Sequence, residues 1–230
     1  MLLQSSCQRF LGAFGPARSR SERYYRFQEL AVSEIDPDGT NFPMFLNSLN
    51  KIQIEGFSEW VRRLFGYGVG ISRKEGHLTI NVVYPHHQMN IVDTGYGISQ
   101  VLPVLGQIWW TVFGSPRVGS GRGSIIAIEQ PELHLHPAHQ ALLADAIVGI
   151  FAEPSLRRTA DFVIETHSEA LINRLGALVQ DQKISSDKLS VVLFDDDEAD
   201  SKPTTTRIAK FNSDGTLVNW PFEFFVPSIR

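Results

Sequence analysis

Residues 125–137 read IIAIEQPELHLHP, and this stretch decides the expected fold. The apolar residues 125–128 have the pattern of a strand buried in a parallel sheet. Glu129, Gln130 and Glu132 follow, so we expect them at the carboxyl end of that strand, where α/β sheets bind ligands. A carboxylate there can hold Mg²⁺ through its water ligands. The alternative is an ordinary strand-to-helix connection whose polar side chains face solvent.

Residues 162–169 repeat this arrangement one strand later. Residues 162–164 predict a strand, and Thr166 with Glu169 fits a capping box that starts a helix. His167 is then expected at a helix N-terminus, where backbone N–H groups favour a bound phosphate. The alternative for a lone histidine is a structural cap or a surface residue. Because consecutive strands of β-α-β units usually pair or lie nearby, we predict that the two strands are parallel neighbours.

The rest of the chain alternates between helix and strand patterns, which predicts an α/β fold with a mostly parallel sheet flanked by helices, with β additions. Apolar spacing near 3.6 residues predicts helices over 52–65 before Gly66, from near Ser99 to Phe113 with Pro103 in the first turn, from Pro137 to Phe151, and over 171–178. Strands are expected over 77–84, 89–92 and 191–194, with a hairpin of 207–211 and 217–220 around Asp214 and Gly215. Residues 1–50 are expected to form loops and short elements. We divide the chain into an incomplete N-terminal part, 1–75, and a main part, 76–230.

Composition and net charge exclude only a few classes of protein. With 230 residues and 43% hydrophobic residues, the chain can bury a substantial core. The net charge of -4 gives no overall attraction to nucleic acid or to an anionic membrane. Cys7 is the single cysteine, and no apolar run has the length of a membrane span, so we expect a cytoplasmic protein without a membrane partner.

Taken together, EQPELHLHP at 129–137 and ETHS at 165–168 resemble the extended Walker B and switch-histidine segments of ABC-type ATPases in the SMC/RecF/OLD-like branch. Members of this branch are often described as AAA-family ATPases, and some belong to anti-phage systems. Further matches in the family's order are GPAR at 15–18, RYY at 23–25, DGTN at 38–41, DTGYGISQ at 93–100, and the closing segment 215–225. The resemblance implies the C-terminal half of an ABC-type P-loop NTPase head.

The resemblance also assigns roles to single residues. Glu129 falls at the Walker B acidic position and is expected to help hold Mg²⁺ beside ATP. Gln130 falls where many relatives have the catalytic Glu. Because Gln can orient a water but cannot accept its proton, either hydrolysis is slow or another carboxylate takes the role of base, with Glu132 as the nearest candidate. His167 falls at the switch position that contacts the γ-phosphate and the attacking water.

The segment around Gly95 corresponds to the ABC signature, which binds the nucleotide of a second head. The expected cofactor-binding residues are Gly95, Gly97, Ser99 and Gln100. Glycines let a backbone approach phosphate closely, and a helix N-terminus adds positive potential. The alternative for these glycines is a tight turn.

The sequence contains no G-x-x-x-x-G-K-S/T motif, and the glycine clusters at 66–70 and 114–123 lack its Lys-Ser/Thr ending. In the family this P-loop lies far N-terminal, so we expect a truncated product, a fragment or one half of a split protein. The expected partner is a P-loop-bearing segment or a second ATPase head in a head-to-tail dimer, with an effector protein also possible. The rival function is a degenerate, non-catalytic half-head that serves as a docking or regulatory module.

Three other features have competing interpretations. Zinc binding by His134, His136 and His139 with Glu132 is disfavoured, because Pro137 breaks the segment and H-E-x-x-H is absent. Residues 195–197 are three aspartates that resemble those of a TOPRIM nuclease, but a solvated loop is favoured. DNA contact by the basic cluster beside Tyr24 and Tyr25 competes with a solvated surface; the cluster comprises Arg9, Arg18, Arg20, Arg23 and Arg26.

Overall fold

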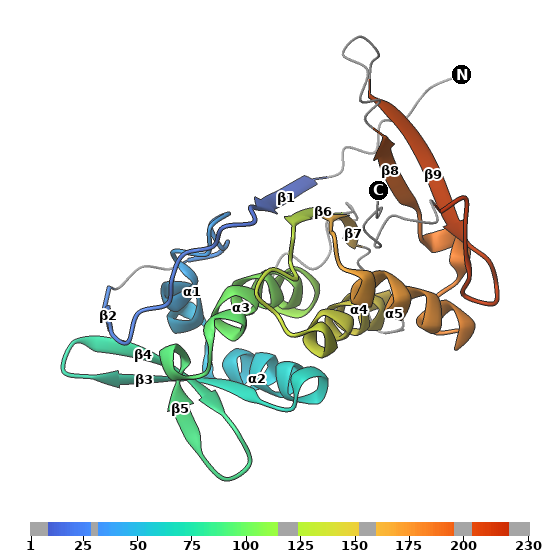
Figure 1. Cartoon of the computed structure of the whole chain (residues 1–230). Helices are drawn as coiled ribbons and strands as arrows, with labels where there is room; N and C mark the ends of the chain where they lie inside the picture. Colours follow the sequence, from blue (N-terminus) through green and yellow to red (C-terminus); the bar gives the residue numbers. More distant parts are fainter. Residues whose placement is uncertain (1–8, 29–31, 115–123, 152–159, 196–203, 221–230) are drawn as a thin grey trace, which may run out of the picture.

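The computed structural model describes residues 9–28, 32–114, 124–151, 160–195 and 204–220 (Figure 1). Its layers are a parallel sheet, a group of helices beneath that sheet, and two antiparallel sheets at opposite ends of the molecule. The architecture is therefore α/β with β additions, as the sequence predicts.

The parallel sheet has the strand order β1-β6-β7, with β1 at Arg9–Phe14, β6 at Ser124–Glu129 and β7 at Ala160–Glu165. Strands β6 and β7 are parallel neighbours with Ile128 opposite Ile164, which confirms the prediction made from their sequences. Strand β1 was not predicted, because residues 1–50 were expected to hold only loops and short elements. It forms because β6 offers a parallel edge, and Phe14 pairs there with Ile128.

The helices cover one face of this sheet. Ile126 and Ile128 are 0% and 1% exposed in a core shared with α3 (Tyr96–Trp109), α4 (Pro137–Phe151) and α5 (Glu169–Gln180). On the opposite face Val163 is 62% exposed. Helix α2 (Lys51–Phe65) lies below α3 and α4 in Figure 1 and ends directly before Gly66, as predicted.

Helix α3 corrects two predictions. It begins at Tyr96 instead of near Ser99, and Pro103 lies in its middle instead of in its first turn. A proline inside a helix removes one backbone hydrogen bond, which normally disfavours the helical conformation. Every residue from Ser99 to Trp109 is buried, so tertiary packing outweighs this local cost. A π-helical turn, Trp110–Gly114, continues the helix.

An antiparallel sheet lies at the end of the molecule opposite the C-terminal strands (Figure 1). Its strands are β2 (Tyr25–Arg26), β3 (Gly68–Lys74), β4 (His77–Val83) and β5 (Gln88–Asn90), and α1 (Phe42–Ser48) packs nearby. Strand β5 stops two residues before the predicted end, because Asn90 accepts a hydrogen bond from the N–H of Val92 and starts a 3-10 turn over Ile91–Asp93. The boundary predicted at residue 75 falls in the β3–β4 hairpin.

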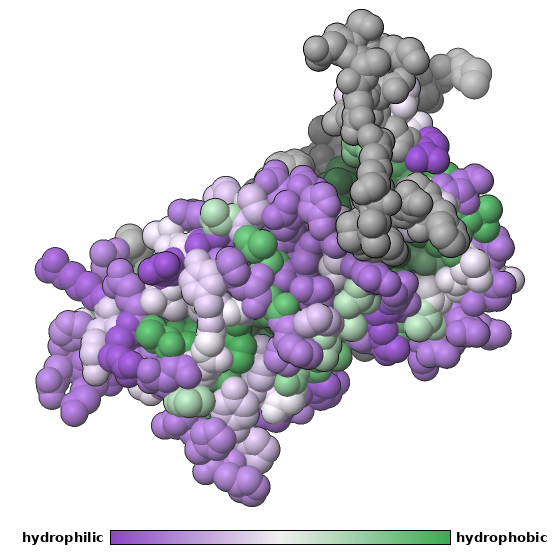
Figure 2. Space-filling model, in the orientation of Figure 1, coloured by the Kyte–Doolittle hydropathy of each residue, from purple (hydrophilic) through white to green (hydrophobic). Residues whose placement is uncertain are grey.

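The C-terminal strands form a separate antiparallel sheet of β8 (Val191–Asp195), β9 (Thr205–Phe211) and β10 (Leu217–Val218), preceded by a 3-10 turn at Ser186–Lys188. The β9–β10 hairpin confirms the hairpin predicted around Asp214 and Gly215. The face drawn in Figure 2 is mainly hydrophilic, with scattered hydrophobic side chains between polar ones. None of the helices in the described ranges has the length and apolar character of a bilayer-crossing segment.

The two faces of the parallel sheet give a first prediction. Ile126→Ala is expected to lower the free energy of unfolding by roughly 2–5 kcal/mol, because it opens a cavity between β6 and the helices. Val163→Ala is the matched control and is expected to cost less than about 1 kcal/mol, since Val163 is 62% exposed. Urea unfolding followed by circular dichroism measures both. Equal losses for the two variants contradict a sheet covered on one face.

Candidate functional site

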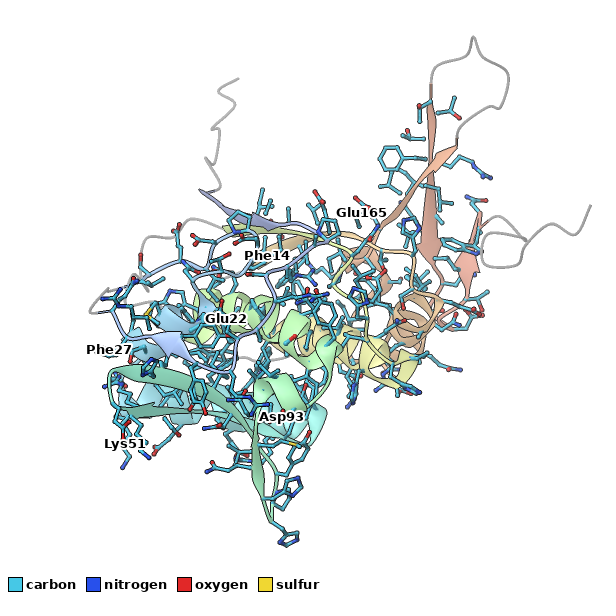
Figure 3. The ribbon with its side chains drawn as sticks, turned by 60° about the vertical axis from the view of Figure 1, so that its left-hand side comes forward. Phe14, Glu22, Phe27, Lys51, Asp93 and Glu165 are labelled. Atoms are coloured by element: carbon cyan, nitrogen blue, oxygen red, sulfur yellow. The ribbon has the colours of Figure 1, made fainter. Side chains whose placement is uncertain are left out.

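The ends of β6 and β7 bring two carboxylates to one edge of the sheet. Glu129 and Glu165 are the last residues of their strands and are register partners. The N–H of Gln130 donates to the carbonyl of Glu165 (2.8 Å), which extends the ladder by one bond. The Gln130 side-chain amide also donates to Oε1 of Glu165 (3.4 Å). Figure 3 labels Glu165 at this end of the sheet, in the same layer as Phe14 of β1.

A tight turn follows β6 and places Glu132 inside the protein. The backbone is left-handed at Gln130 (φ 43°) and at His134 (φ 66°), which reverses the chain within five residues. Glu132 is only 7% exposed, and its Oε1 accepts a hydrogen bond from the backbone N–H of His167 (2.8 Å). This bond joins the turn after β6 to the turn after β7. The structure thus brings together four predicted site residues: Glu129, Gln130, Glu132 and His167.

His167 lies directly before helix α5, and its side chain is exposed. The predicted capping box of Thr166 and Glu169 is wrong, because the N-cap is Ser168, whose Oγ accepts from the N–H of Leu171 (3.0 Å). Thr166 instead accepts from the N–H of Ser168 (3.0 Å). The Thr166 hydroxyl thus forms a local turn with Ser168, and the helix begins at Glu169. The His167 imidazole still lies beside the positive end of a helix, which favours anions.

Arg18 belongs to this site, although the sequence placed it in an exposed basic cluster. It is 4% exposed, and its Nη2 donates to the carbonyl oxygens of Glu129 (3.0 Å) and Gln130 (3.5 Å). Burial lowers the pKa of Arg18 to about 10, and the nearby Glu132 carboxylate acts against this shift. Arg18 therefore stays charged at neutral pH. The available sequence signal was the GPAR match at 15–18, which gave Arg18 no role.

The other described arginines of that cluster lie at the surface. Arg20 stands over the ring of Tyr96 at 5.9 Å, and Arg26 is exposed on β2. Arg23 pairs with Asp93, whose pKa is held below its usual value mainly by the hydrogen bond from this guanidinium. Figure 3 labels Asp93 on the side of the helices away from the parallel sheet. The structure does not describe the side chain of Arg9.

The start of α3 packs against the turn after β6. Gly95 is the N-cap with φ 96°, a conformation that favours glycine. A Cβ on Gly97 would lie 2.5 Å from the carbonyl oxygen of His134 and 3.2 Å from Leu135. The rings of Tyr96 and His134 also meet edge to face, with centroids 4.8 Å apart. Gly97 thus permits close contact with a turn of its own chain.

The other two residues of the signature-like segment are buried. Ser99 is 5% exposed, and its Oγ donates to the carbonyl of Tyr96 (2.7 Å). Gln100 is 1% exposed, and its Nε2 donates to the carbonyl of Ser19 (3.1 Å). Both side chains make contacts within the chain, so they are not free to bind a nucleotide, and the surface here is formed by the exposed Gly95 and Tyr96.

Two other interpretations of the sequence concern zinc binding by histidines and a nuclease-like group of aspartates. Within the described ranges, no group of three or more His, Cys, Asp or Glu side chains is arranged to hold a metal ion. His134 faces Tyr96, and His136 accepts from the N–H of Ala138 (3.2 Å). His139 packs on Phe65, and burial followed by the charge of His136 lowers its pKa. The aspartates at 196–197 lie outside the described residues.

The arrangement suits a phosphate ester bound with a hard cation. Exposed carboxylates at the ends of two adjacent strands are oxygen ligands of the kind that Mg²⁺ binds, with the remaining ligands supplied by water and phosphate. An imidazole at a helix N-terminus adds a hydrogen-bond donor. Glu129 fits Mg²⁺, Glu165 places a second carboxylate beside it, and His167 fits a phosphate oxygen.

Comparison with known proteins gives a family. The family described as AAA ATPase domain matches residues 22–172. Among curated proteins nothing matches. Similar solved structures include one from work on ATP-driven dimerization and DNA-stimulated activation of SMC ATPases, at 13% identity and a TM-score of 0.46, covering 76% of this chain and 89% of that one.

Two further similar structures are SMC heads with bound partners. The SMC head of Pyrococcus furiosus, with an extended coiled coil and the C-terminal domain of ScpA, has 13% identity and a TM-score of 0.43, covering 69% of this chain and 34% of that one. An SMC head bound to the C-winged helix domain of ScpA has 12% identity and a TM-score of 0.43, covering 69% and 42%.

Gly97 gives a second prediction. Gly97→Ala is expected to destabilise the protein by roughly 1–3 kcal/mol, because its methyl group would overlap the carbonyl of His134. Gly149→Ala in α4 is the matched control, since a Cβ there meets no atom within 4 Å. The control is expected to stabilise the protein by up to about 1 kcal/mol through helix propensity. Thermal unfolding distinguishes them, and a stabilising Gly97→Ala contradicts the close packing.

Proposed function

The chain belongs to the family of AAA ATPase domains, and on that premise we propose that it forms the Mg²⁺- and γ-phosphate-facing half of an ATP-hydrolysing head of the ABC type. The observation that carries this proposal is the pairing of Glu129 with Glu165 at the ends of parallel strands. His167 is tied to the same place through Glu132. Walker B and switch functions require these groups to reach one phosphate.

In this proposal Glu129 holds Mg²⁺, which neutralises charge on the phosphates when bound. Gln130 orients the attacking water, because its amide can both donate and accept hydrogen bonds. Glu132 is buried and accepts the N–H of His167, so it is poorly placed to act as base. Glu165 is exposed and lies 3.4 Å from the Gln130 amide, so we assign the proton-accepting role to Glu165.

His167 donates a hydrogen bond to the γ-phosphate in this scheme. Its position before α5 adds the potential of the helix N-terminus to that of the imidazole. Donors aimed at charge that develops in the transition state often account for a large share of catalysis. His167 therefore serves turnover more than nucleotide affinity.

The α- and β-phosphates need a P-loop, and no such motif occurs in this sequence. We propose that a P-loop-bearing segment, from preceding sequence or from a partner, completes the head. The backbone around Gly95 and Gly97 at the start of α3 then faces the nucleotide of a second head in a head-to-tail dimer. An anti-phage role, a cytoplasmic location, an effector and DNA contact stay predictions based on the sequence.

The P-loop requirement predicts how the chain behaves alone. The 230-residue chain is expected to bind Mg-ATP with a Kd above roughly 1 mM, because a P-loop normally supplies most phosphate contacts. Isothermal titration calorimetry measures this directly. Micromolar affinity for the pure chain contradicts the proposal that the nucleotide is held mainly from elsewhere.

The switch role of His167 is tested in a head completed by the P-loop-bearing polypeptide. His167→Ala is expected to lower kcat about 100-fold, equivalent to about 3 kcal/mol of lost transition-state stabilisation, with KM for ATP little changed. His86→Ala on the β4–β5 connection is the control and should leave kcat unchanged. Gln130→Glu is expected to raise kcat by adding a second proton acceptor. Unchanged turnover in His167→Ala refutes the switch role and favours a docking module.

A further inference from the structure

Arg18 is a cation buried beside the site without full hydrogen bonding. It is 4% exposed, and of its guanidinium nitrogens Nη2 bonds the carbonyl of Glu129 (3.0 Å), while Nε and Nη1 are buried without a hydrogen-bond partner. Burying a charge is costly unless an opposite charge or hydrogen bonds compensate. The position of Arg18 therefore needs a physical explanation.

Glu132 provides an opposite charge near Arg18. It is itself 7% exposed, and its Oε2 is buried without a hydrogen-bond partner. Its charge acts on Arg18 in the favourable direction. The two groups are thus opposite charges in the same buried place, each with unused hydrogen-bonding capacity. The other oxygen of Glu132 accepts the N–H of His167 (2.8 Å).

The backbone around Arg18 is also anchored by hydrogen bonds outside the parallel sheet. Its chain neighbour Ser19 donates its N–H to the carbonyl of Asp38 (2.7 Å) and accepts from Gln100 of α3 (3.1 Å). Gly15 donates its N–H to the carbonyl of Pro37 (3.3 Å). The guanidinium consequently reaches the end of β6 from a segment that is held by β1 on one side and by these bonds on the other, so it can brace the turn.

We propose that Arg18 and Glu132 act as a unit of positioning residues: Arg18 fixes the backbone at Glu129 and Gln130, and the charge-balanced Glu132 fixes His167. This inference rests on the proposed function for the meaning of that geometry. Neither residue touches nucleotide in this role. The pair sets the spacing between the end of β6 and the turn after β7, and α3 is joined to it through Ser19.

A double-mutant cycle on the 230-residue chain tests the unit without nucleotide. Arg18→Met leaves a buried, unbalanced carboxylate and is expected to lower Tm by roughly 6–12 °C. Glu132→Gln keeps an oxygen for His167 but removes the charge. The double variant Arg18→Met/Glu132→Gln is expected to recover at least half of the loss seen in Arg18→Met. Arg26→Met, at the exposed arginine of β2, is the control and should shift Tm by less than about 2 °C.

Additive losses in the double variant overturn the proposal, because independent residues show no coupling. If Arg18→Met does not fold, the double variant is still expected to fold, and its failure to fold also overturns the proposal. A recovered Tm supports the unit whether or not ATP is hydrolysed. The double-mutant cycle can therefore contradict the positioning unit while His167→Ala still supports the switch role. Equally, the cycle can support the unit while His167→Ala contradicts the switch role.

The backbone N–H of His167 provides a signal specific to positioning. In Glu132→Ala its hydrogen exchange, followed by NMR, is expected to accelerate at least roughly tenfold, while Glu132→Gln should retain most of the protection. Arg18→Met is expected to accelerate it as well. The N–H of Leu171, bonded to Ser168 in the same helix, is the internal control and should not change. Unchanged exchange at His167 in Glu132→Ala and Arg18→Met contradicts the positioning role.

Discussion

The register between β6 and β7 is the constraint on which the candidate site depends. A parallel ladder places Glu129 opposite Glu165, and the N–H of Gln130 adds one further bond to Glu165 (2.8 Å). A slip of one residue would turn Ile126 and Ile128 to the exposed face and carry the Glu129 carboxylate away from the edge. Burial of two isoleucines against the helices thus holds the acidic groups in place.

Local sequence patterns predicted the elements that depend on local physics. The apolar run of β6, the proline at the start of α4 and the alternation of β4 each specify their own conformation. Strand β1 could not be found this way, because it is defined by a partner strand far along the chain. The start of α3 was placed too late because Pro103 was assigned to the first turn, whereas burial of Ser99 to Trp109, which sequence periodicity does not report, lets the helix accommodate this proline in its middle.

The residues of the candidate site were also predicted only in part. The clustering of Glu129, Gln130, Glu132 and His167 followed from two strand ends, whereas their roles stay predictions. Arg18 was missed because an arginine in an Arg/Ser-rich segment is usually solvated, and only tertiary contacts bury this one. From the sequence, Gly97 was expected to let the backbone approach a phosphate. In the structure, the absence of a Cβ at Gly97 makes room for the carbonyl of His134.

The turn between β6 and α4 has a property that its hydrogen bonds alone do not convey. Gln130 and His134 both occupy the left-handed region, where a side chain costs about 1 kcal/mol or more per residue. Clamps from outside hold this shape: the Gln140 amide bonds the carbonyls of Leu135 (3.0 Å) and Glu132 (3.4 Å), and Arg18 holds the other side. These hydrogen bonds offset the conformational cost of the two left-handed residues. Loss of one of these bonds would leave that cost uncompensated, so the stability of this loop depends on residues that lie outside it.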